Sequence, residues 1–186
     1  MAIFASGGGS NARRLMFQGC RSNHYEVVLV LTDRIQSGVQ RHAKEFSVPV
    51  EVVCWNDLSS TTLMATLAQY NVDFIVLAGF LRLVPQEIIG HFHARIVNLH
   101  PSLLPKFGGK GMYGRKVHEA VFNAQENQTG ITIHYVSEQY DEGAIIAQFV
   151  IEISPQDSIE QIEFKVRELE SQHFVNTVEE VCKNTL

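Results

Sequence analysis

Short runs of β-branched and other apolar residues alternate with segments of helical spacing through the first hundred residues of the chain. The apolar runs cover residues 2–6, 26–32, 48–54, 72–78 and 94–100, and the helical segments cover 11–20, 39–46, 58–70 and 85–92. Runs such as 27–31 and 74–78 are apolar at every position, as are the strands of a parallel sheet that helices cover on both sides. The alternation predicts an α/β fold, an open, mostly parallel, twisted sheet with helices on both faces.

The pattern changes after residue 100. We predict a glycine-rich loop over 101–114, a helix over 115–125, strands over 131–136 and 144–153, and one long helix or two over 157–182. The segment that joins the two late strands is short enough for an antiparallel pair. Because no repeat, low-complexity tract or linker interrupts the chain, we predict a single domain over residues 1–186.

The charge balance limits the partners of such a domain. The chain has 15 Lys and Arg against 20 Asp and Glu, a formal net charge of -5, so it lacks the positive field of a nucleic-acid-binding protein. An anion must therefore be held by local geometry. The three cysteines show no zinc-ligand spacing, so no metal is expected. Without a basic leader or an apolar stretch of ~20 residues, we expect a cytoplasmic protein that does not enter the membrane.

The first candidate site is the segment Gly7-Gly8-Gly9-Ser10-Asn11, between the first strand and the first helix. Free amides at a helix start, near the positive end of the helix dipole, favour an anion such as phosphate. The Walker A lysine is missing. Gly7-x-Gly9-x-x-Ala12, with Asp33 at the end of the second strand, also satisfies the loose dinucleotide fingerprint. A glycine turn without function is the third interpretation.

The second candidate is the pair Asn98 and His100, followed by Pro101. Residues two apart on a strand share one face, with Cβ atoms about 6.5–7 Å apart. Pro101 favours extended geometry at His100, and so places it at the carboxyl end of a parallel strand, where open α/β sheets bind ligands. An amide beside an imidazole suits the stabilisation of an oxyanion. A buried structural histidine is the alternative, which the paired asparagine makes less favourable.

The third candidate is Asp141, in Asp141-Glu142-Gly143 between the two late strands. A carboxylate within reach of His100 would favour the imidazolium form and fix the ring. Asp-x-Gly is also common turn chemistry, and the residues alone favour the turn. His134, within a late strand, faces either the site or the sheet.

The lysines of the glycine-rich loop, Lys106 and Lys110, are predicted to be solvated or, alternatively, to attract an anionic substrate.

Four motifs carry a family resemblance: Gly7-Gly8-Gly9-Ser10-Asn11, Ala78-Gly79-Phe80-Leu81-Arg82-Leu83, Asn98-x-His100-Pro101-Ser102-Leu103-Leu104-Pro105 and Asp141-x-Gly143. In this order and spacing they resemble the phosphoribosylglycinamide (glycinamide ribonucleotide) formyltransferase family over nearly the whole chain. The third motif is shared with methionyl-tRNA formyltransferases and with hydrolases of 10-formyltetrahydrofolate. The N-terminal glycine-rich loop and the length favour the glycinamide ribonucleotide branch.

The resemblance implies a Rossmann-like formyltransferase fold, with ribonucleotide phosphate bound by the N-terminal half and folate by the C-terminal half. It makes Asn98, His100 and Asp141 catalytic. It assigns the ribonucleotide and its phosphate to Gly9, Ser10, Asn11 and Glu170, with Arg167 assisting. It assigns the folate to Leu81, Arg82, Leu83 and Val84, with Ser137, Glu138, Gln139 and Tyr140 closing the pocket.

The implied reaction transfers the formyl group of 10-formyltetrahydrofolate, a cosubstrate, to the amine of glycinamide ribonucleotide in purine biosynthesis. Asn98 and a protonated His100 hold the oxyanion, and Asp141 keeps His100 charged and assists proton transfer. The partners are these small molecules, with no nucleic acid, membrane or metal, and the protein is a monomer or homodimer. Hydrolysis of 10-formyltetrahydrofolate is the nearest alternative. A dinucleotide-binding oxidoreductase or sensor is the alternative from another class.

Overall fold

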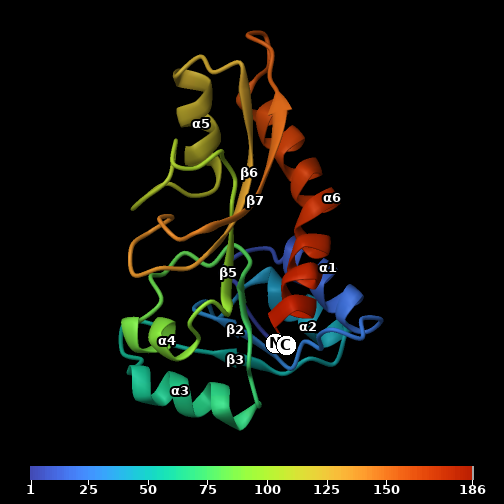
Figure 1. Ribbon diagram of the computed structural model, residues 1–186, viewed down its shortest axis with the longest axis vertical. Helices are drawn as coiled ribbons and strands as arrows, with labels where there is room; N and C mark the ends of the chain where they lie inside the picture. Colours follow the sequence, from blue (N-terminus) through green and yellow to red (C-terminus); the bar gives the residue numbers. More distant parts are fainter. Residues whose placement is uncertain (186) are drawn as a thin grey trace.

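Seven strands form one sheet in the order β3-β2-β1-β4-β5-β6-β7 (Figure 1) in the computed structural model, which describes residues 1–185. The strands are β1 (Ala2–Phe4), β2 (Leu29–Thr32), β3 (Val50–Val52), β4 (Ile75–Leu77), β5 (Ile96–His100), β6 (Gln128–Tyr135) and β7 (Ile145–Glu152). The strands β1 to β5 are parallel, whereas β6 pairs antiparallel with both β5 and β7. The predicted fold class is confirmed, including the late antiparallel pair.

Helices cover the two faces of this sheet. They are α1 (Ser10–Gly19), α2 (Gly38–Glu45), α3 (Ser60–Gln69), α4 (Gln86–His91), α5 (Arg115–Asn123) and α6 (Ile159–Thr185). Residues of α1, α2 and α6 pack in one core cluster and those of α3 and α4 in another. In β1, Ile3 joins the first cluster while Ala2 and Phe4 join the second, as the alternation of side chains along a doubly covered strand requires.

The strand order reverses between β1 and β4, and this reversal positions the site. From β1 the chain builds outward to β3, then returns to add β4 and β5 on the other side of β1. The loops that leave β1 and β4 meet at the carboxyl edge of the sheet, where the Ser6 N–H donates to the Gly79 carbonyl oxygen at 3.1 Å. Such a switch point is where open α/β sheets hold their ligands.

Several boundaries differ from those predicted. β6 begins at Gln128, three residues early, because the polar Gln128 and Thr129 pair with β7. Pro85 is the N-cap of α4 rather than its first helical residue. The C-terminal segment, predicted as one helix or two, is the single helix α6. No helix within residues 1–185 combines the length and the apolar character needed to cross a membrane.

Candidate active site

Strands β5 and β6 bring Asn98, His100 and His134 to one place. Asn98 lies opposite His134 in the antiparallel register, and the Asn98 Nδ2 atom is 3.1 Å from His134 Nε2. The His134 Nδ1 atom is 2.8 Å from the Tyr135 carbonyl oxygen, to which it can donate, which leaves Nε2 of a neutral ring to accept from the asparagine amide. Asn98 and His100 share one strand, as predicted. His134, which the sequence left undecided, faces the site.

Asp141 completes this cluster. Its Oδ2 atom lies 3.4 Å from His100 Nδ1 and accepts a hydrogen bond from the Gly109 N–H at 2.9 Å. Its Oδ1 atom lies 3.5 Å from Asn98 Nδ2. The residue has a φ of 59°, and a Cβ on Gly143 would lie 1.6 Å from the Tyr135 carbonyl oxygen. Asp141 therefore lies in a tight turn, as the residues alone favour, and this turn also brings its carboxylate beside His100.

Opposing influences act on the pKa of His100. The ring is buried, and burial lowers the pKa of His100 although the Asp141 carboxylate and the Phe107 carbonyl oppose this effect. The expectation that Asp141 keeps His100 protonated stays a prediction, with the burial of the ring opposing it and the Asp141 carboxylate favouring it. Burial alone would raise the pKa of Asp141, but contacts with His134, His100 and the Gly109 N–H outweigh it and lower this pKa. The cluster thus holds a carboxylate beside a buried histidine, and the pKa of each is lowered.

Lowering the pH from about 7.5 to 5.5 should cost the wild type more stability than a His100→Gln variant. Because the folded-state pKa of His100 is lowered from 6.5, its contribution to stability is complete above about pH 6.5 and is lost as the pH falls through the folded-state pKa. His118 acts in the same direction and Glu170, with a raised pKa, in the opposite one. Urea unfolding of both proteins at both pH values isolates His100. Equal losses would contradict the lowered pKa.

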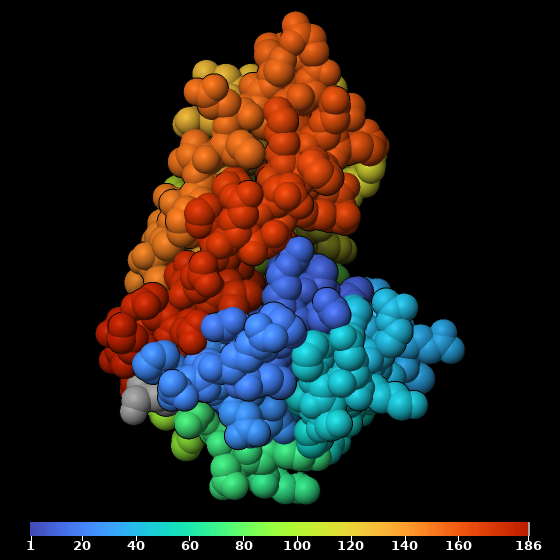
Figure 2. Space-filling model, turned by 90° about the vertical axis from the view of Figure 1, so that its right-hand side faces the viewer, coloured from blue at the N-terminus to red at the C-terminus, as the bar shows by residue number. Residues whose placement is uncertain are grey.

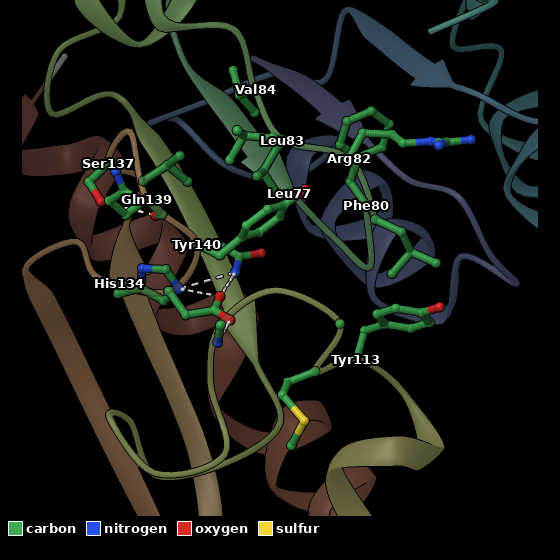
Figure 3. Close-up of a pocket in the computed structure, with 17 residues that line it drawn as sticks. Leu77, Phe80, Arg82, Leu83, Val84, Tyr113, His134, Ser137, Gln139 and Tyr140 are labelled. Atoms are coloured by element: carbon green, nitrogen blue, oxygen red, sulfur yellow. Dashed lines mark hydrogen bonds and ion pairs between the residues drawn. The ribbon is translucent and has the colours of Figure 1, made fainter. Parts of the chain in front are cut away.

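The cluster lies at one end of a pocket (Figure 3) with about 660 Å³ of empty space, its open mouth included. The predicted folate residues that line it are Leu81, Arg82, Leu83, Val84, Ser137, Gln139 and Tyr140. Glu138 does not line it and instead accepts a hydrogen bond from Gln86 Nε2 at 2.7 Å. His100 does not line the pocket either. Its Nε2 atom is 2.8 Å from the Phe107 carbonyl oxygen, which occupies this side of the ring.

Sequence reasoning missed part of the pocket wall. Gly109, Gly111, Met112 and Tyr113 of the glycine-rich loop line it together with His134. The Met and Tyr beside several glycines were a signal for a loop that faces a ligand. The side of the sheet on which His134 lies depends on the strand register, which the sequence does not give. Lys106 forms an ion pair with Glu126 at 2.8 Å. Lys110 lines a neighbouring depression that includes Glu138.

The start of α1 has the local geometry that the predicted anion site requires. Gly9 is the N-cap with a φ of 79°, and no side chain caps the helix, so the first amides of α1 are free to bind an anion. The Asn11 Nδ2 atom donates to Glu170 Oε2 of α6 at 2.8 Å, which brings these two predicted residues together. Arg167 is exposed and pairs with Glu163 on its own helix. Figure 2 shows α6 lying across this face against the N-terminal segments.

Gly9→Ala should lower the free energy of unfolding by about 1–3 kcal/mol, the usual cost of a strained backbone position. A Cβ there would lie 2.7 Å from Val39 Cα, at a φ of 79°. Gly7→Ala is the matched control, because a Cβ on Gly7 meets nothing within 4 Å. Urea unfolding of both variants measures the difference. Equal stability of the two would contradict the described geometry of the loop.

Comparison with known proteins identifies the family. The family model described as formyl transferase matches residues 1–178. The chain belongs to the formyl transferase family. It is 39% identical to the chloroplastic phosphoribosylglycinamide formyltransferase of Arabidopsis thaliana over 194 residues, which cover 100% of the chain and 66% of that relative. It is 32% identical to the Bacillus subtilis phosphoribosylglycinamide formyltransferase over 186 residues, 97% of the chain and 93% of that relative.

A solved structure of a relative supports the same family membership. The crystal structure of phosphoribosylglycinamide formyltransferase from Bacillus halodurans superposes with a TM-score of 0.86 at 35% identity, and the match covers 97% of this chain and 93% of that one. The predicted family resemblance is confirmed. The chain spans only 66% and 62% of the lengths of the Arabidopsis thaliana and Vigna unguiculata relatives. Both of those are named as chloroplastic, so the cytoplasmic location of this protein stays a prediction.

Proposed function

We propose that this protein transfers the formyl group of 10-formyltetrahydrofolate to the amine of glycinamide ribonucleotide, a step of purine biosynthesis. The observation that carries the proposal is the convergence of Asn98, His100 and Asp141, from β5 and from the turn before β7, beside one pocket. The names of the relatives support the same substrate.

The proposed binding mode uses two separate regions. The free amides of Gly9, Ser10 and Asn11 receive the phosphate, because a helix start favours an anion in a protein of net charge -5. Glu170, which accepts from Asn11, faces the ribonucleotide. The folate lies in the pocket between residues 81–84 and 137–140. Since residues 81–84 belong to the first half of the chain, both halves contribute to the folate site.

In the proposed reaction the amine nitrogen attacks the formyl carbon, a C–N bond forms, and the bond from that carbon to folate N10 breaks. One proton leaves the attacking amine and one is gained by N10. Asn98 Nδ2, whose contact with Asp141 is long at 3.5 Å, is available to donate to the developing oxyanion. Preorganised donors aimed at developing charge supply a large part of such catalysis.

His100 serves this reaction by taking up the proton that leaves the attacking amine as the oxyanion forms and passing it on to N10. Its pKa is lowered by burial in the ligand-free protein, and a new negative charge beside the ring opposes that effect. The ring is therefore more readily protonated in the transition state than in the ground state, which is the difference that accelerates a reaction. The Phe107 carbonyl must release His100 Nε2 for this contact. Asp141 orients the ring and assists the proton transfer.

Measurement of tetrahydrofolate and formate with and without glycinamide ribonucleotide tests the proposal. We expect tetrahydrofolate release that depends on the ribonucleotide, without formate. Formate release in the absence of the ribonucleotide would show a hydrolase instead. The dinucleotide alternative requires a free acid at Asp33, but the Asp33 Oδ2 atom lies 2.7 Å from Arg82 Nε. Saturable binding of NAD in a calorimeter would restore that alternative.

A further inference from the structure

Asp33 and Arg82 join two loops at the switch point of the sheet. Asp33 directly follows β2, and its side chain is only 3% exposed. Arg82 belongs to the segment that follows β4 and donates from Nε to Asp33 Oδ2 at 2.7 Å. Figure 3 shows the Arg82 guanidinium pointing away from His134 and the pocket. The side chain that the family resemblance assigns to folate is therefore engaged with a nearly buried carboxylate.

Ser6 forms hydrogen bonds with the same segment after β4. The Leu81 N–H donates to Ser6 Oγ at 3.2 Å, and the Ser6 N–H donates to the Gly79 carbonyl oxygen at 3.1 Å. Burial alone would raise the pKa of Asp33, but the neighbouring Ser6 hydroxyl and the Arg82 guanidinium outweigh it and lower this pKa. The carboxylate thus attracts the Arg82 guanidinium toward the end of β2.

The segment held in this way forms one wall of the pocket. Residues 78–84 have no regular secondary structure, and Gly79 has a φ of 73°. Phe80 packs edge-on against Phe4 and Trp55, with ring centroids 5.4 and 4.8 Å away. Between Phe80 and the buried Val84, Leu81 is only half-buried and Leu83 is exposed, so apolar packing fixes this part of the wall less firmly than its two ends. The polar contacts to Ser6 and Asp33 hold that part.

We propose that Asp33 is a positioning residue for the folate, which through Arg82 holds residues 81–83 in the shape that the pteridine requires. This inference rests on the proposed function. Asp33 does not line the pocket and does not touch the reacting atoms. Its loss should therefore weaken folate binding and leave both the chemical step and the ribonucleotide site unchanged.

Asp33→Asn tests this role, because it removes the charge while it preserves the shape. We expect the KM for 10-formyltetrahydrofolate to rise about tenfold, on the order of the contribution of one charged hydrogen bond. We expect kcat and the KM for glycinamide ribonucleotide to stay within about twofold of the wild type. Glu45→Gln is the matched control, since Glu45 pairs with Arg13 at 2.7 Å outside the pocket lining. It should change none of these constants.

Arg82→Gln removes the same ion pair by changing its exposed partner, and it replaces Asp33→Asn in the test if that variant folds poorly. The double variant Asp33→Asn/Arg82→Gln should bind folate with the same affinity as whichever single variant binds it less tightly, because the two substitutions remove the same interaction. A KM for folate raised in the double variant by the product of the two single-variant factors would contradict the proposal. So would a loss of thermal stability in Asp33→Asn with both KM values unchanged, which is the signature of a purely structural residue.

Direct binding separates this inference from the proposed function. Calorimetry with tetrahydrofolate as the probe should show about tenfold weaker binding to Asp33→Asn than to the wild type. Equal affinities, with normal turnover by the wild type, would overturn the positioning role alone. Absence of both folate binding and formyl transfer in the wild type would overturn the proposed function and, with it, the positioning role.

Discussion

Replacement of Asp141 by asparagine is expected to lower kcat at least 100-fold, while the KM for glycinamide ribonucleotide changes by less than about threefold. A positioned acid or base contributes about 10²–10⁴-fold to such a reaction. Asp141 is the carboxylate beside His100 Nδ1, at 3.4 Å, so its loss removes the charge that favours protonation of the ring in the transition state. Steady-state kinetics at neutral pH measure both constants.

Asp157→Asn is the control for this variant. Asp157 is also an ion-paired carboxylate, bonded to Lys165 and to the Ser154 N–H, but it lies outside the pocket lining. Its kcat should match that of the wild type. Near-normal turnover of Asp141→Asn, or an equal loss in both variants, would contradict the role assigned to Asp141.

Asn98→Ala is expected to lower kcat by about 10²–10³-fold, the usual effect of removing one oxyanion donor. The loss should fall on kcat rather than on either KM, since the developing charge exists only in the transition state. Rapid-mixing measurement of a single turnover gives the chemical step directly. The variant Asn98→Ala/Asp141→Asn should be less impaired than the product of the two single effects, because the residues act as one unit. Fully multiplicative losses would show that they act independently.

The sheet and the placement of the candidate site at its carboxyl edge were predictable because their signals are local. Apolar runs such as 74–78 specify a strand covered on both faces, and the parallel order then places Asn98 and His100 at the edge where the loops after β1 and β4 meet. The Gly9 turn was equally local, since its φ of 79° strongly favours glycine.

The remaining features depend on contacts between segments far apart in the sequence. The register between β6 and β7 shifts at Ile133 and His134, so alternation along the sequence could not decide which face His134 takes. The pairing of Arg82 with Asp33 spans 49 positions. The lowered pKa of His100 depends on how deeply the fold buries the ring, which a motif does not encode. These are also the features that change the expected mechanism most.

The central claim is that the formyl group passes to the ribonucleotide amine. Mass spectrometry of the nucleotide after incubation with 10-formyltetrahydrofolate and the protein tests it directly. We predict that glycinamide ribonucleotide gains one formyl group for each tetrahydrofolate released, and that Asp141→Asn forms this product at least about 100-fold more slowly. An unmodified nucleotide, with tetrahydrofolate appearing at the wild-type rate, would contradict the claim.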